Sequence, residues 1–88
     1  MDNENILAVL PLLRREFDAA LAKHPFFPSH APDMMCIIAE EFGELAKEIN
    51  DRRPGWRARA LLEVTHVAVT SLRTMKVLQD EILTGNQG

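Results

Sequence analysis

The sequence has little that could cross-link it or anchor it in a membrane. Cysteine occurs once, at Cys36, so no disulfide can form within the chain. We expect Cys36 to be a small buried hydrophobic residue in a reducing compartment. No apolar run approaches the roughly 20 residues that a membrane-spanning helix needs, and the acidic N-terminal segment does not resemble a signal peptide. We therefore expect a cytoplasmic protein with no membrane partner.

A strong excess of charge of one sign is also lacking. Ten Lys and Arg residues against 13 Asp and Glu give a net charge of −3, which argues against a nucleic-acid partner or an anionic membrane surface. With 47% hydrophobic residues in an 88-residue chain, the composition is typical of one small globular domain over residues 1–88.

Hydrophobic periodicity predicts an all-α fold, in which an N-terminal helix precedes a helical hairpin. The expected helices span residues 12–23, 34–50 and 57–83. Asp33 is the expected N-cap of the second helix, after a proline-rich connector over residues 24–32.

The ends of the expected helices follow from proline and glycine. Pro11 disfavours α conformation at Leu10, so residues 3–10 are expected to form a separate turn or a kinked extension. Gly85 ends the third helix, and we expect residues 85–88 to be a frayed tail.

The third helix is apolar on nearly every side between Ala60 and Leu72. Two other helices of one chain cannot cover so large an apolar circumference. The sequence therefore predicts a homodimer or homotetramer, with a four-helix core formed by the second and third helices of two chains.

Acidic residues gather on one face of the second helix, at Glu41, Glu44 and Glu48. In an antiparallel hairpin, two residues tend to face each other when their residue numbers add up to the same sum as those of the other facing pairs. This register pairs Glu44 with Glu63, Glu41 with His66, and Glu48 with Arg59. We therefore expect two i,i+3 pairs, one on each helix, to meet at the same level.

Three carboxylates and an imidazole at one level can bind a hard divalent cation. Oxygen ligands favour Mg²⁺, and Mn²⁺ is favoured if His66 coordinates. The alternative is a solvated acidic face stabilised by pairs such as Glu44 with Lys47, each contributing a few tenths of a kcal/mol. His66 could equally be a satisfied interior histidine.

Two motifs resemble those of the MazG-like nucleotide pyrophosphohydrolases, in the all-α NTP pyrophosphatase superfamily. Glu40-Glu41-Phe42-Gly43-Glu44 is similar to the EExxE motif of that family, and Glu63-Val64-Thr65-His66 is similar to its ExxD motif except at the last position. The resemblance covers about residues 26–78 and extends to shorter phage and prophage members.

The resemblance implies a helical oligomer that binds Mg²⁺ and hydrolyses a nucleoside triphosphate to the monophosphate and pyrophosphate. It implies metal ligands at Glu41, Glu44 and Glu63, with His66 standing where the family has Asp. Glu40 or Glu48 could activate water, and the candidate phosphate contacts are Arg57, Arg59 and Arg73.

Two further functions stay open on the same motifs. One is a catalytically weakened helical oligomer that serves as an interaction or regulatory module, because His66 replaces an anionic oxygen ligand. The other is phosphoribosyl-ATP pyrophosphohydrolase, which shares the scaffold. Residues 40–48 resemble the MazG-like pattern more closely than they resemble that enzyme. The adjacent Phe26 and Phe27 either cover a helix end or line a nucleotide pocket.

Overall fold

The computed structural model describes residues 3–85, which contain helices and no strand. The elements are α1 (Asn3–Ile6), a 3₁₀ turn η1 (Leu7–Val9), α2 (Leu10–Lys23), α3 (Ala31–Asp51) and α4 (Trp56–Leu83). The expected all-α fold is confirmed for these residues. Of the tail expected to fray, residues 86–88 lie outside the described range.

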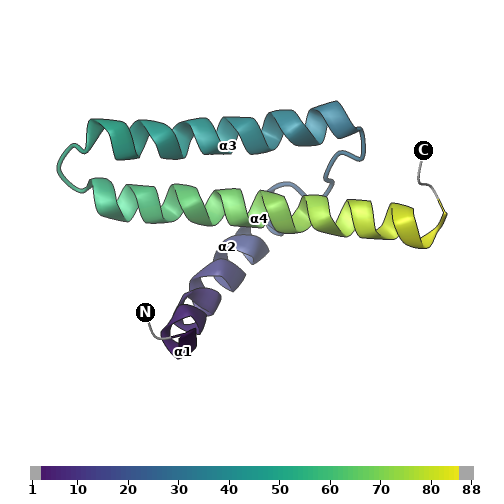
Figure 1. Cartoon of the computed structure of the whole chain (residues 1–88), viewed down its shortest axis with the longest axis horizontal. Helices are drawn as coiled ribbons and strands as arrows, with labels where there is room; N and C mark the ends of the chain where they lie inside the picture. The colour runs from purple at the N-terminus through teal and green to yellow at the C-terminus, as the bar shows by residue number, and fades with distance from the viewer. Residues whose placement is uncertain (1–2, 86–88) are drawn as a thin grey trace.

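Helices α3 and α4 form an antiparallel hairpin, and α2 crosses α4 at a steep angle (Figure 1). Helix α4 contacts both of the other long helices, whereas α3 contacts α4 alone. The middle of α4 is therefore the place where side chains from all three helices can meet. No helix between residues 3 and 85 combines the length and the apolar content needed to cross a bilayer.

The turn of the hairpin depends on two residues with positive φ. Arg52 ends α3 with a φ of 50°, and Gly55 precedes α4 with a φ of 83°. A Cβ added to Gly55 would lie 3.0 Å from a guanidinium nitrogen of Arg59. Glycine is therefore favoured at this position by backbone conformation and by the close approach of Arg59.

Two helices begin earlier than the sequence predicted. Leu10 is helical, with φ −59° and ψ −40°, and Pro11 lies in the first turn of α2. Helix α3 begins at Ala31 after His30, so Asp33 is a first-turn residue and not the N-cap. The predicted starts at residues 12 and 34 were wrong for the same reason: proline fits the first turn of a helix, where its missing N–H costs no hydrogen bond. Residues 3–9, expected to be a turn or a kinked extension, form α1 and η1 directly before α2.

The core of the single chain is thin. Met34 and Val69 are its most buried apolar residues, at 3% and 2% exposed, together with Ala60. Buried Thr65 donates its hydroxyl to the Leu61 carbonyl oxygen at 2.6 Å. Cys36 is exposed, contrary to the expectation of burial, because it lies on a side of α3 that no other helix within residues 3–85 covers.

Candidate metal centre

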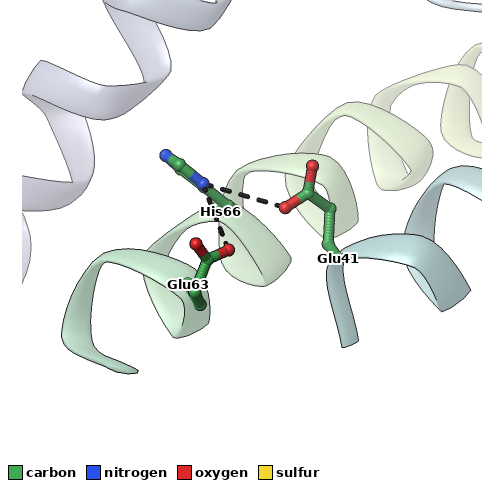
Figure 2. Close-up of side chains that lie close together, drawn as sticks. All are labelled: Glu41, Glu63 and His66. Carbon is green, nitrogen blue, oxygen red and sulfur yellow. Dashed lines mark ion pairs between the residues drawn. The ribbon is translucent and has the colours of Figure 1, made fainter. Parts of the chain in front are cut away.

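The α3–α4 hairpin brings together Glu41, Glu63 and His66, which we call the acidic cluster. Glu63 and His66 are three residues apart on α4, so their side chains project from the same face. Glu41 reaches them from α3 across the hairpin, and Figure 2 shows both carboxylates directed toward the imidazole. The pairing of Glu41 with His66 follows the predicted register.

The three side chains lie within a few ångströms of one another. His66 Nδ1 is 3.7 Å from Glu41 Oε2 and 3.7 Å from Glu63 Oε2. One ligand atom of each residue lies within 4.8 Å of the other two. Two carboxylate oxygens and one imidazole nitrogen therefore face a common point between α3 and α4.

A fourth residue, Glu16 of α2, was missed by the sequence analysis. Its Oε1 atom is 3.5 Å from His66 Nε2, and its side chain is largely buried. The imidazole thus lies between Glu16 on one side and the hairpin carboxylates on the other. The only available signal was the position of Glu16 beside Leu12, Leu13 and Phe17 in α2, which does not specify what that helix packs against.

Two oxygens of this cluster are buried without a hydrogen-bond partner, Glu41 Oε2 and Glu63 Oε2. Burial raises the pKa of the Glu41 carboxyl above its ordinary value, and the nearby charges of Glu44 and Glu40 raise it further. His66 acts in the opposite direction. Glu41 therefore pays a desolvation penalty that its neighbours in the chain do not fully offset.

Glu63 shows the same electrostatic problem. Burial raises the pKa of its carboxyl, and the adjacent Glu44 carboxyl raises it further, whereas His66 lowers it. Glu44 itself is exposed and adjoins the group formed by Glu41, Glu63 and His66 without belonging to it.

The donor set fits a divalent cation. Ligand atoms of an octahedral Mg²⁺ lie about 3 Å apart, given metal–oxygen distances near 2.1 Å. The 3.7 Å distances from His66 Nδ1 to the two carboxylate oxygens therefore require a closure of under about 1 Å each, which small side-chain rotations can supply. A cation would also give the two orphaned carboxylate oxygens a partner.

The remaining candidate residues on the hairpin, Glu48, Arg57 and Arg59, make contacts near its turn. Glu48 Oε2 accepts a hydrogen bond from Arg59 Nε at 2.8 Å, as the register predicted. The other guanidinium nitrogens of Arg59 donate to the carbonyl oxygens of Pro54 and Arg53. Arg57 lies over the ring of Trp56 at 4.7 Å. None of these groups joins the cluster around His66.

Two other candidates, Glu40 and Arg73, line a cavity that opens from the cluster. The same cavity is lined by Glu16, Glu41 and His66. Glu40 is exposed there, whereas Arg73 donates to the carbonyl oxygen of His24 at 2.7 Å. The structure thus brings Glu41, Glu63 and His66 together, places Glu40 and Arg73 on the adjoining cavity, and leaves Glu48, Arg57 and Arg59 outside both.

This arrangement can hold one divalent cation beside a cavity that the exposed carboxylate of Glu40 also lines. Cations bound in this way neutralise phosphate charge and activate water. Comparison of the chain with protein-family models, with curated proteins and with solved structures finds no match.

Proposed function

We propose that the chain is a metal-dependent pyrophosphohydrolase that converts a nucleoside triphosphate to the monophosphate and pyrophosphate. The observation that carries the proposal is the pair of buried carboxylate oxygens, Glu41 Oε2 and Glu63 Oε2, which lack a partner and face the same imidazole nitrogen. A buried cluster of acids is unfavourable unless a cation compensates it. The resemblance of residues 40–44 and 63–66 to the MazG-like motifs supports the same activity.

In this proposal Glu41, Glu63 and His66 hold the metal, with Glu44 beside them. Bound Mg²⁺ or Mn²⁺ would supply neutralisation of phosphate charge and a lowered pKa of bound water. Glu16 Oε1 lies 3.5 Å from Nε2 of His66, and this contact would keep Nδ1 directed toward the other two carboxylates. Carboxylate partners of this kind commonly orient metal-binding histidines.

Glu40 is the better placed of the two carboxylates that could orient the attacking water. It lines the cavity and is exposed, whereas Glu48 is held by Arg59. Of the three candidate arginines, Arg73 lines the same cavity, but its guanidinium already contacts the carbonyl oxygen of His24 and the ring of Phe27 at the connector end. Arg57 and Arg59 serve the hairpin end instead, through Trp56 and the turn carbonyls.

We also propose that two chains form a four-helix core from α3 and α4. Exposed apolar residues on α3 recur every seven positions, at Met35, Phe42 and Ile49. On α4 they include two groups at three- and four-residue steps, Leu61 with Val64, and Met75 with Leu78 and Ile82. Such spacing is typical of helices that pack along a seam, and exposed apolar patches of this kind are unusual on monomers.

A second function, a helical interaction module without catalysis, has one specific observation in its favour. A protonated His66 would place a positive charge between Glu16, Glu41 and Glu63, all within 3.7 Å. The imidazolium would then compensate the acids without a metal. The apolar seam of α3 and α4 serves an oligomer equally well under either function.

Calorimetric titration of Mg²⁺ and of Mn²⁺ separates the two functions, with and without a nonhydrolysable nucleoside triphosphate. The enzyme predicts saturable metal binding that the nucleotide tightens and that Glu63→Gln removes. Glu81→Gln, on the same helix but away from the cluster, is the control and keeps wild-type binding. Absence of metal binding in the presence of nucleotide would instead favour the interaction module.

A further inference from the structure

The cavity beside the acidic cluster has two chemically different ends. It encloses about 670 Å³ between α2, the connector after it, and the α3–α4 hairpin. That volume lies within the range of small-molecule sites, about 300–1,000 Å³. The end formed by Glu16, Glu40, Glu41 and His66 is polar and contains the candidate metal ligands.

The opposite end is formed by the last turn of α2 and the connector. Lys23, His24, Phe26 and Phe27 line it. Glu16 and Lys23 are seven residues apart on α2, which corresponds to about 10 Å along the helix axis. Between them the wall is made by Ala19 and Ala20, whose small side chains leave the cavity open.

The two phenylalanines at this end differ in their surroundings. Phe27 lies under the guanidinium of Arg73 at 4.8 Å. It also lines a second, apolar cavity, which lies between α2 and α4. Phe26 is 91% exposed although it lines the cavity. Phe27 therefore contributes to packing, whereas the ring of Phe26 stabilises little within the described part of the chain.

We infer that the connector end is the base-recognition subsite of the proposed nucleotide site, with Phe26 as its stacking platform. The inference rests on the proposed function, because it takes the phosphates to lie at the acidic end. An exposed aromatic face in the cavity that Glu41 and His66 also line is suited to a flat, apolar ring. A nucleoside triphosphate has such a ring, its base, at one end and its charged phosphates at the other.

The inference also assigns a role to the alanines of α2. A ligand that reaches from Glu41 to Phe26 must pass Ala19 and Ala20, which line the cavity between its ends. Ala19 is exposed, so a larger side chain there changes the cavity without entering the core. Leucine is a strong helix former, so Ala19→Leu keeps α2 helical while narrowing this passage.

The test compares two ligands that differ only in the nucleoside. Binding of a nonhydrolysable nucleoside triphosphate and of inorganic triphosphate is measured with Mg²⁺ for wild type, Phe26→Ala and Ala19→Leu. Leu83→Ala is the control, because Leu83 is also a strongly exposed apolar residue but lies at the end of α4, outside the cavity. Thermal unfolding of each variant establishes that it remains folded.

We expect Phe26→Ala to weaken nucleotide binding about 5- to 100-fold, the range measured for loss of one stacking aromatic. Ala19→Leu should weaken it as well, and neither change should alter the affinity for inorganic triphosphate. Wild-type nucleotide affinity in Phe26→Ala, or an equal loss in Leu83→Ala, would overturn the inference and leave the proposed function standing. If wild type binds neither ligand, the proposed function fails and this inference with it.

Discussion

Arg59 of α4 binds Glu48 of α3 through a 2.8 Å contact between Nε and Oε2, while its other nitrogens donate to the carbonyl oxygens of Arg53 and Pro54. The side chain of Arg59 thus connects α3, the turn and α4. Because this contact fixes the register of the hairpin, it also fixes which residues meet at the acidic cluster one and two turns away.

The first prediction concerns this contact. Arg59→Met should lower the free energy of unfolding by about 1–2 kcal/mol, because three hydrogen bonds are lost from a partly exposed site. Arg53→Met, a neighbouring exposed arginine whose contribution to the turn is its backbone carbonyl, should change it by under about 0.5 kcal/mol. Urea denaturation measures both. Equal effects of the two substitutions would contradict the assigned role of Arg59.

The second prediction concerns pH in the absence of metal. The pKa of Glu41 is raised from its ordinary value of 4.5 by burial and by neighbouring acids. The folded state therefore holds a proton that the unfolded state has lost, and Glu41 destabilises the fold as the pH rises through and above that value. Glu41→Gln removes this term, because the amide carries no charge.

Chelator-treated wild type and Glu41→Gln should accordingly differ little in stability near pH 4. This pH is about half a unit below the ordinary pKa of the carboxyl, so the Glu41 carboxyl is mostly protonated in both the folded and the unfolded state. The variant should become increasingly more stable than wild type toward neutral pH. Denaturant titrations at several pH values provide the comparison. A stability difference that shrinks as the pH rises would show that Glu41 is stabilised in its charged form.

The third prediction is that a divalent metal stabilises the chain. A ligand that binds only the folded state adds about 2.7 kcal/mol when present at 100 times its Kd. Millimolar Mg²⁺ or Mn²⁺ should therefore raise the Tm of wild type, and Glu63→Gln should abolish the increase while raising the Tm of the metal-free chain. Thermal scans with and without metal measure both effects. A full metal response in Glu63→Gln would exclude Glu63 as a ligand.

The acidic cluster shows how far the sequence alone could lead. The helical register places Glu41 opposite His66 and Glu48 opposite Arg59, because an antiparallel hairpin with a short turn leaves few alternatives. Glu16 could not be foreseen, since its contact with His66 depends on the angle at which α2 crosses α4. Periodicity identifies the buried face of a helix but not its crossing angle.

The helix starts and Cys36 show a different limit. Local rules excluded Pro32 from α3, yet proline is compatible with a first turn, so the boundary moved by three residues. The apolar surroundings of Cys36 in sequence suggested burial, but no other helix in the described part of the chain covers that side of α3. Burial depends on the number of neighbouring helices, which a sequence pattern does not give.

The fourth prediction concerns assembly. Light scattering at micromolar concentration should give at least twice the 9.9 kDa mass of the chain. Met75→Glu places a charge on the exposed apolar seam of α4 and should shift the protein toward monomer. Gln79→Glu adds the same charge at an exposed polar position of the same helix and should not. A wild-type mass of one chain would contradict the four-helix core.

The fifth prediction concerns His66, where the chain departs from the motif it resembles. His66→Asp supplies an oxygen ligand, so we expect tighter binding of Mg²⁺. His66→Ala should weaken Mn²⁺ more than Mg²⁺, because imidazole contributes more to the softer ion. Parallel calorimetric titrations test both. If the two variants bind each metal as wild type does, His66 is a structural histidine held between Glu16 and the hairpin carboxylates.

The most direct test of the proposed function is product analysis after incubation of the purified chain with a panel of nucleoside triphosphates and Mg²⁺ or Mn²⁺. Wild type should release pyrophosphate and the monophosphate in equal amounts from at least one of them, and Glu63→Gln should lose most of that activity. Glu81→Gln should retain it. Absence of pyrophosphate from every nucleotide with either metal, or equal release by Glu63→Gln, would contradict the account.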